Sequence, residues 1–196
     1  MSDDNFNSTA STTAIPEAID DCEINYPPWN FSWVVPGKLA AMAWPQTVSN
    51  LKYLKEDEGI DHLITLSPEK IPPIKDYTGL HWTPLAIKEF EPPTIKQILK
   101  FIDICQRSEL QNEAIGIHCR MGRGRTGVMA ACYLIRFQDL TPQRAMTNLR
   151  LMRPGSIETP EQERVVMRYY DCLRGVKNSE IIDVYEDDIV KLITND

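Results

Sequence analysis

The sequence predicts an α/β domain with a central, mainly parallel sheet flanked by helices and with a helical C-terminal half. Two observations lead to this fold class. Short apolar segments bounded by Gly and Pro alternate with segments of helical periodicity as far as residue 119, and three helical segments follow. A hydrophobic content of 42% and a charged content of 25% are ordinary for a globular protein, and 196 residues suffice for one domain with extensions.

The strands are expected where apolar runs stand next to turn residues. The first contains Trp33 and Val34, and a turn at Pro36-Gly37 leads into the second. The last, in EAIGIHC, ends at Cys119. The expected strands are 31–35, 38–43, 60–67, 80–87 and 113–119.

The helices are expected from capping signals as well as from apolar periodicity. Thr94 with Gln97 predicts a capping box, and Thr159 with Gln162 predicts a second one. Gly59 stands where a glycine commonly ends a helix. The expected helices are 47–59, 95–107, 126–138, one that begins at Thr141-Pro142 and one that begins at Thr159-Pro160.

The charge is distributed unevenly along the chain. The net charge is −7, yet residues 1–25 hold six acidic and no basic side chains, and residues 179–196 hold six acidic and one basic. The remainder is therefore mildly basic, which favours an anionic substrate. We expect an acidic, disordered extension at 1–25, a functional domain at 26–174 and an acidic C-terminal extension at 175–196.

The five cysteines favour a reducing compartment, because they are widely spread and form no CxxC pair. Residues 1–25 lack the basic start and apolar middle of a signal peptide. No apolar run reaches the roughly 20 residues that cross a bilayer. We therefore expect a protein of the cytoplasm, with the nucleus as a further location, and no transmembrane segment.

The segment GIHCRMGRGRTG at 116–127 carries the strongest functional signal. It leads from a strand through a glycine-containing loop into a helix, and in such a turn backbone N–H groups and the helix N-terminus face a bound anion. The two loop glycines allow backbone angles that larger residues resist. The residues expected around a phosphate are Arg120, Met121, Gly122, Arg123, Gly124 and Arg125.

Cys119, at the end of the strand, is the candidate nucleophile. Loop amides, the helix N-terminus and Arg125 stabilise the thiolate form, which is the form that attacks phosphorus. The planar fork of Arg125 fits two phosphoryl oxygens. Thr126 is a candidate donor to the sulfur when the intermediate breaks down. His118 is expected to support the loop through hydrogen bonds rather than to act as an acid or base.

Other kinds of site are excluded. No Gly-x4-Gly-Lys-Ser/Thr motif occurs, so the loop is not of the Walker A type. His118 and Cys119 are neighbours on a strand and point to opposite faces, so they do not form a protease pair. The cysteines lack metal-binding spacing, and neither a metal nor another cofactor is expected.

The pattern His-Cys-x-x-Gly-x-Gly-Arg-Thr-Gly at 118–127 resembles the Cys-x5-Arg loop of the cysteine-dependent protein-tyrosine phosphatases. Within them, residues 26–174 are similar to the small atypical dual-specificity phosphatases. Besides the loop, the similarity rests on NFSWVVPGKLA (30–40) and RPGSIETPEQE (153–163). The resemblance implies a protein-tyrosine-phosphatase-like fold and a reaction through a cysteinyl-phosphate intermediate.

The same resemblance implies a general acid, an aspartate on a loop before the cysteine that is followed by an aromatic residue and prolines. IKEFEPPT at 87–94 occupies this place, with Glu89 where the family has aspartate. Glu91 is the competing candidate, and a weak or absent acid is a third alternative. Glu158, in SIET, stands where larger tyrosine phosphatases carry a water-positioning glutamine, so it is a candidate for the second step.

Arg120 and Arg123 stand where phosphoinositide phosphatases carry basic residues, so both are candidates for recognising extra negative charge. Three functions remain open. They are a phosphatase for phosphotyrosine and phosphoserine or phosphothreonine in proteins, a phosphatase for a non-protein anion such as a phosphoinositide or an RNA 5′-phosphate, and a phosphate-binding module without turnover. The expected partner is a phosphorylated protein or another phosphorylated anion. We expect a monomer and no stable nucleic-acid binding.

Overall fold

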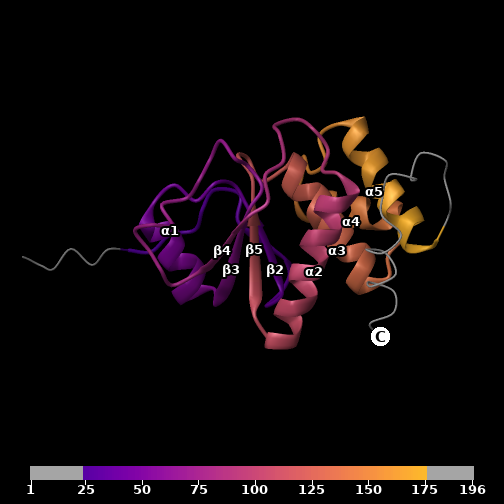
Figure 1. Cartoon of the computed structure of the whole chain (residues 1–196). Helices are drawn as coiled ribbons and strands as arrows, with labels where there is room; N and C mark the ends of the chain where they lie inside the picture. Colours follow the sequence, from indigo (N-terminus) through magenta and orange to yellow (C-terminus); the bar gives the residue numbers. More distant parts are fainter. Residues whose placement is uncertain (1–23, 176–196) are drawn as a thin grey trace, which may run out of the picture.

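The computed structural model of the chain describes residues 24–175 and contains one five-stranded sheet (Figure 1). Its strands are β1 Ser32–Val35, β2 Leu39–Met42, β3 Ile60–Thr65, β4 His81–Pro84 and β5 Ala114–His118. Their order across the sheet is β1-β2-β5-β3-β4. β1 pairs with β2 antiparallel, and all other neighbours pair parallel. The predicted α/β class with a mainly parallel sheet is confirmed.

The described helices are α1 Val48–Lys52, the π-helical η1 Tyr53–Asp57, α2 Ile95–Gln111, α3 Gly124–Gln138, α4 Pro142–Met152 and α5 Pro160–Leu173. α1 and η1 lie on one side of the sheet, and α2 to α5 lie on the other (Figure 1). α3 is buried from its first residue to Ile135. α3, α4 and α5 make up the predicted helical C-terminal half.

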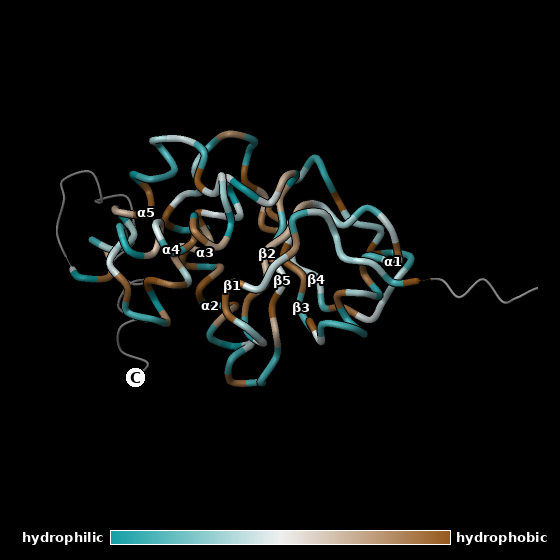
Figure 2. Tube along the Cα trace, turned by 180° about the vertical axis from the view of Figure 1, so that it is seen from behind, coloured by the Kyte–Doolittle hydropathy of each residue, from teal (hydrophilic) through white to brown (hydrophobic). Residues whose placement is uncertain are grey.

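β2, and β5 as far as Ile117, are apolar along their length because layers cover both faces of the sheet. Alternate residues of β2 point to opposite faces. Leu39 and Ala41 belong to the larger apolar core, shared with α2 to α5, and Ala40 and Met42 belong to a smaller core shared with α1 and η1. In Figure 2 the hydrophobic segments, drawn in brown, accordingly lie mostly on and beside the strands of the sheet.

The first predicted capping box forms as expected. Thr94 accepts from the backbone N–H of Gln97, and the Gln97 side chain accepts from the backbone N–H of Thr94. α2 nevertheless runs to Gln111 rather than to 107, and it ends where Asn112 adopts φ +56°. The helix is longer than predicted because its stop signal is a left-handed asparagine, which is less conspicuous than a glycine.

Of the two hydrogen bonds of the second predicted capping box, one forms and the other is wrong. Thr159 accepts from the backbone N–H of Gln162 at 3.2 Å, as predicted. The Gln162 side chain, however, accepts from the backbone N–H of Glu158 at 2.8 Å rather than from that of Thr159. This shift by one residue connects Gln162 to the segment that carries a candidate site residue.

The two predicted acidic extensions lie outside the described residues, except for positions 24, 25 and 175. Asn25 donates hydrogen bonds to Glu56 (3.3 Å) and Asp57 (3.0 Å), so this residue is attached to η1. Within residues 24–175, none of the helices combines the length and the apolar character that a membrane span requires.

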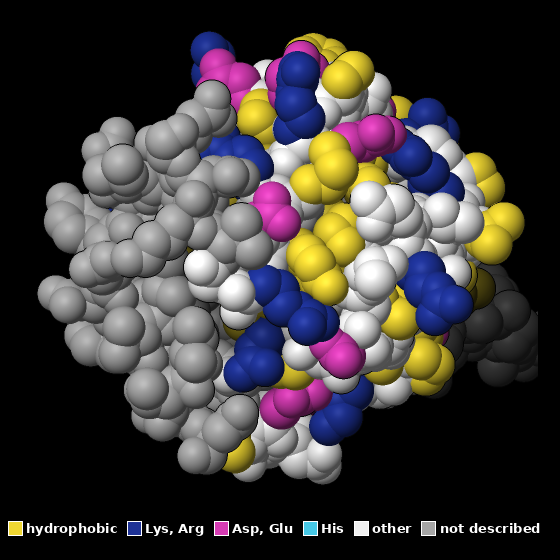
Figure 3. Space-filling view, turned by 90° about the vertical axis from the view of Figure 1, so that its right-hand side faces the viewer, with side chains coloured by type: hydrophobic (Ala, Val, Ile, Leu, Met, Phe, Trp, Pro, Cys, Tyr) yellow, Lys and Arg dark blue, Asp and Glu magenta, His cyan; other side chains and the backbone are white. Residues whose placement is uncertain are grey.

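Charges of both signs are interspersed over the outer face of the helical layer (Figure 3). In this layer Arg150 of α4 pairs with Glu163 of α5, and Arg164 pairs with Glu161 within α5. Exposed pairs of this kind each contribute little to stability. The layer is therefore held together mainly by its apolar core.

Tyr169 on α5 offers a test of that core. It is fully buried, and its hydroxyl has no hydrogen-bond partner among the described residues. Burial raises the pKa of this phenol. Because a buried, unpaired hydroxyl costs free energy, we expect Tyr169→Phe to raise the free energy of unfolding in urea by about 1 kcal/mol. The control Tyr53→Phe removes a hydroxyl that donates to Glu58 and should lower stability; equal effects would contradict this account.

Candidate active site

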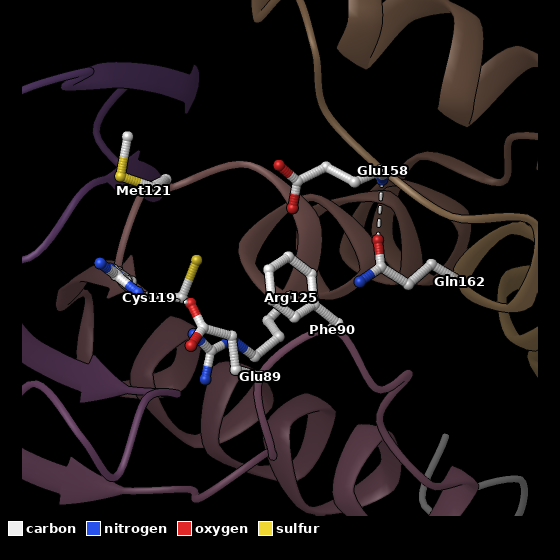
Figure 4. A pocket seen from close by; sticks show the side chains of 8 residues that line it. Glu89, Phe90, Cys119, Met121, Arg125, Glu158 and Gln162 are labelled. Atoms are coloured by element: carbon white, nitrogen blue, oxygen red, sulfur yellow. Dashed lines mark hydrogen bonds and ion pairs between the residues drawn. The ribbon is translucent and has the colours of Figure 1, made fainter.

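The lining of one pocket, of about 280 Å³, brings together most of the predicted site residues (Figure 4). It lies beyond the carboxyl end of β5, where parallel sheets usually bind ligands. The loop over 119–123 forms its floor, and the segments after β4 and before α5 form opposite walls. Among residues 24–175, no group of three or more His, Cys, Asp or Glu side chains is placed to hold a metal ion. The lining residues are Glu89, Phe90, Cys119, Arg120, Met121, Arg125, Glu158 and Gln162.

Two glycines let the loop lie directly against its neighbours. Gly122 has φ +68°, and a Cβ atom there would lie 2.4 Å from the backbone carbonyl of Met42. A Cβ atom on Gly124 would lie 2.3 Å from Oε2 of Glu158. α3 begins at Gly124, rather than at the predicted 126, because the Gly127 N–H donates to the carbonyl that precedes Gly124 and closes the first turn there. The helix N-terminus is thereby brought to the pocket.

Cys119 and His118 lie on opposite sides of the end of β5. Cys119 lines the pocket, whereas His118 is fully buried with its Nε2 2.7 Å from Thr65 Oγ1. Thr65 in turn accepts a hydrogen bond from the Trp82 indole at 2.9 Å. Burial lowers the pKa of His118 to about 3, so the ring is neutral at pH 7. This placement agrees with the supporting role expected for His118.

Thr126 is fully buried in the first turn of α3 and does not line the pocket. Its hydroxyl has no hydrogen-bond partner among the described residues. The expected donation to the Cys119 sulfur therefore stays a prediction, although the hydroxyl is free to make it.

The Arg125 guanidinium is hydrogen-bonded through its two terminal nitrogens, and one of its edges keeps unpaired N–H groups. Nη1 donates to Glu69 Oε2 (3.2 Å) and to the Ile87 carbonyl (2.9 Å), and Nη2 donates to Glu69 Oε1 (2.6 Å). Three of the five guanidinium N–H groups are thus used. The remaining two, on Nε and Nη2, share one edge and have no partner among the described residues. That edge is the one that can take two phosphoryl oxygens.

The anchoring also fixes the charge of the pair. Although burial opposes ionisation, the hydrogen bonds to Glu69 raise the pKa of Arg125, whose side chain is only 4% exposed. Burial likewise opposes the ionised form of Glu69, but the Arg125 hydrogen bonds lower the pKa of this carboxyl. The guanidinium is therefore held charged and in one orientation beside the Cys119 sulfur.

The structure separates the two candidate acids. Glu89 lines the pocket, whereas Glu91 pairs with Lys88 at 2.6 Å and does not line the pocket. Phe90, between them, has φ +64°, an unusual angle for an aromatic residue that turns the chain at this point. Glu89 therefore has the position that a general acid requires.

Arg120 and Arg123, predicted to act alike, take different places. Arg120 lines the pocket and donates from Nη1 to Glu89 Oε1 at 3.2 Å. Arg123 lies over the ring of Trp29, with its guanidinium carbon 5.4 Å from the ring centroid. The Arg123 side chain is not part of the pocket lining, so contact with a phosphate through this side chain has no support in the geometry.

Glu158 and Gln162 form the wall opposite Glu89 (Figure 4). Ile157, just before Glu158, is buried at φ +61°, a costly conformation for a β-branched residue. Arg150 donates to the Ile157 carbonyl at 3.0 Å and helps to hold it there. The strained turn brings Glu158 into the pocket, and the side chain of Gln162 is fixed by its bond to the Glu158 N–H.

Arg153 is a second buried cation beneath the loop. It donates from Nη1 to the Ala41 carbonyl (2.9 Å) and to Ser32 Oγ (2.5 Å), and from Nη2 to the Gly122 carbonyl (2.9 Å). Burial lowers the pKa of Arg153 to about 10, which leaves it charged at neutral pH. This arginine therefore ties the loop to β1 and β2 and adds positive charge below it.

Three residues of this arrangement were missed from the sequence. Arg153 opens the segment RPGSIETPEQE, which carries part of the family resemblance, so that segment was a signal for it. Gln162 was assigned only a capping role. Glu69 lies in SPEKIPP, which has no local feature that points to Arg125.

The fold and this strand, loop and helix arrangement define a phosphatase domain of the tyrosine and dual-specificity type. The family model described as "Swiss Army Knife protein, DSP-PTPase phosphatase domain" matches residues 28–166. The chain belongs to this family.

Curated relatives carry the same class of domain within longer chains. Dual specificity protein phosphatase CDC14A of Mus musculus is 30% identical over 148 residues, which are 68% of this chain and 24% of the relative. Phosphatidylglycerophosphate phosphatase PTPMT1 of Arabidopsis thaliana is 28% identical over 137 residues, 67% of this chain and 40% of the relative. The chain thus spans about a quarter to two-fifths of the length of these relatives.

Solved structures share the fold. Tk-PTP in its active form superposes with a TM-score of 0.66 at 23% identity, over 72% of this chain and 97% of Tk-PTP. PTPMT1 in complex with PI(5)P gives a TM-score of 0.65 at 19% identity, over 72% of this chain and 94% of PTPMT1. The expected protein-tyrosine-phosphatase-like fold is confirmed.

The buried His118 leads to a prediction for stability against pH. Its folded pKa of about 3 lies below the ordinary value of 6.5. Below about pH 6.5 the unfolded chain therefore binds a proton that the folded chain excludes, so stability falls as pH falls. Between pH 6 and 5 the free energy of unfolding should fall less steeply in His118→Gln than in the wild-type chain, by about 1 kcal/mol per pH unit. The control is the exposed His81→Gln, and the same flattening in both variants would contradict the assignment.

Proposed function

We propose that this chain is a cysteine-dependent phosphatase that hydrolyses phosphomonoesters on proteins, phosphotyrosine first and phosphoserine or phosphothreonine as well. The observation that carries the proposal is the open Nε/Nη2 edge of Arg125 beside Cys119, at the N-terminus of α3. Within the family we place the chain among the small atypical members, near dual specificity protein phosphatase 23, on the segments 30–40 and 153–163.

In the first step, the Cys119 thiolate attacks phosphorus while the phosphoryl oxygens bind Arg125 and the loop N–H groups. The N-terminus of α3, Arg125 and the buried Arg153 all favour negative charge at this place. An S–P bond forms as the P–O bond of the ester breaks. Glu89 gives its proton to the leaving oxygen, which otherwise would depart as an alkoxide or phenoxide.

In the second step, water attacks the phosphorus of the cysteinyl-phosphate. Glu89, now ionised, takes a proton from this water, the S–P bond breaks, and inorganic phosphate is released. Gln162 is the proposed positioning residue for the water. Its Oε1 is occupied by the Glu158 N–H, so its amide N–H groups remain to bind the incoming oxygen.

Replacement of the nucleophile tests the mechanism directly. We expect Cys119→Ser to reduce the turnover of phenyl phosphate by about 10⁴-fold or more, because the serine hydroxyl has no base to activate it. The variant should still bind inorganic phosphate in calorimetry. Cys172→Ser, on the far end of α5, is the control and should keep turnover; undiminished turnover in Cys119→Ser would rule the mechanism out.

Replacement of the proposed acid tests its role through the leaving group. Glu89→Gln should lower kcat by about 100-fold for phenyl phosphate, a typical contribution of general acid catalysis. The loss should be much smaller for 4-nitrophenyl phosphate, whose leaving group departs without a proton. Glu91→Gln is the matched control and should leave both rates unchanged. Equal losses on both substrates would place the acid elsewhere.

A further inference from the structure

We infer that Arg120 is a specificity-determining residue that couples substrate choice to the general acid. In the free enzyme Arg120 forms an ion pair with Glu89. A second anionic group on the substrate binds Arg120 instead and thereby releases Glu89 from the pair. This inference rests on the proposed function, since it assigns Glu89 the role of acid. The substrate it selects is a phosphotyrosine peptide with a carboxylate or a second phosphate close to the phosphotyrosine.

The contact behind the inference joins two separate elements at the pocket mouth. Nη1 of Arg120 lies 3.2 Å from Oε1 of Glu89. The Arg120 side chain is 52% exposed and that of Glu89 is 33% exposed. The backbone of Arg120 is fixed, because its carbonyl accepts from the Trp44 N–H at 3.3 Å. The guanidinium can therefore change partner without any change in the loop.

The ion pair with Arg120 and the role of general acid require different states of the Glu89 side chain. An ion pair with a guanidinium needs the carboxylate to be ionised, whereas a general acid must hold a proton. While the pair persists, Oε1 of Glu89 is engaged by Arg120 and is not presented to a leaving oxygen. Release of Arg120 leaves the Glu89 carboxyl free to face the leaving oxygen of an ester bound in the pocket.

A second anion on the substrate can win this competition. An exposed ion pair through one N–H group contributes little. A carboxylate or phosphate can bind the same guanidinium through two parallel hydrogen bonds, which is the stronger arrangement. Beyond the contact with Glu89, the described residues offer the Arg120 side chain no hydrogen-bond partner, so its other N–H groups are available.

The side chains of the neighbouring arginines are held by other contacts and cannot change partner in the same way. Arg125 is bound to Glu69 and Ile87, and Arg123 lies over Trp29. The charged groups that line the pocket around Glu89 are Arg120 and Arg125 on the loop side and Glu158 on the opposite wall. Of these two cations, only Arg120 forms a hydrogen bond with Glu89 among the described residues, at 3.2 Å, so the partner of Arg120 decides how Glu89 is paired.

The experiment compares phenyl phosphate with 3-carboxyphenyl phosphate, whose leaving groups are of similar acidity. For the wild-type chain we expect kcat to be about fivefold or more higher for the carboxylated substrate, the lower range of coupling between two binding events. Arg120→Met should abolish this difference, because it removes both the hold on Glu89 and the site for the carboxylate. Lys88→Met, which removes a cation paired with Glu91 on the same segment, is the matched control and should keep the difference.

The split between kcat and KM separates coupling from simple attraction. An Arg120 that only attracts anions would lower KM and leave kcat unchanged, and this result would overturn the inference. So would a kcat difference that survives in Arg120→Met or disappears in Lys88→Met. Hydrolysis of both substrates at equal kcat by the wild-type chain would contradict the inference alone. Hydrolysis of neither substrate would instead contradict the proposed function.

A second arm tests the class of substrate. It compares a peptide with one phosphotyrosine against the same peptide with two adjacent phosphotyrosines, and inositol monophosphate against an inositol bisphosphate. The inference expects the higher kcat in the peptide pair, beyond the statistical gain from two equivalent phosphates, and expects Arg120→Met to remove it. A gain confined to the inositol pair would overturn the assignment to a phosphopeptide.

Discussion

The shape of the candidate active site depends on one close approach, between the backbone at Gly122 and the end of β2. No side chain fits between them, and Arg153 bonds both the Gly122 carbonyl and the Ala41 carbonyl. β2 and β5 are paired in parallel with Met42 opposite His118, so the loop starts where β2 ends. The sheet register therefore determines where the loop amides and the first turn of α3 lie.

Two buried arginines make this place positive in a chain whose net charge is −7. They are compensated differently. Arg125 has a carboxylate partner in Glu69, which sets its orientation, whereas Arg153 bonds to two carbonyls and one hydroxyl. A buried cation without a carboxylate leaves positive charge uncompensated. The positive charge of Arg153 beneath the loop therefore favours an anion over a neutral group at this place.

The parts of this protein that follow local rules could be predicted from its sequence. The strand, loop and helix around Cys119, the capping box at Thr94 and the glycine at 59 each depend on residues a few positions apart. The partners of the loop depend on residues far apart in the chain, such as Glu69 with Arg125, and no short pattern specifies them. The same limit explains why Arg120 and Arg123, three positions apart, were predicted to act alike. Their different orientations depend on Glu89 and Trp29, which the fold alone brings to them.

The stacking of Arg123 on Trp29 has a consequence for observing this protein. The indole of Trp29 is exposed, and the guanidinium above it belongs to the loop that follows Cys119. Indole emission responds to a cation held near the ring. Any rearrangement of the loop that lifts Arg123 from Trp29 should therefore change the fluorescence of this tryptophan, one of four in the chain.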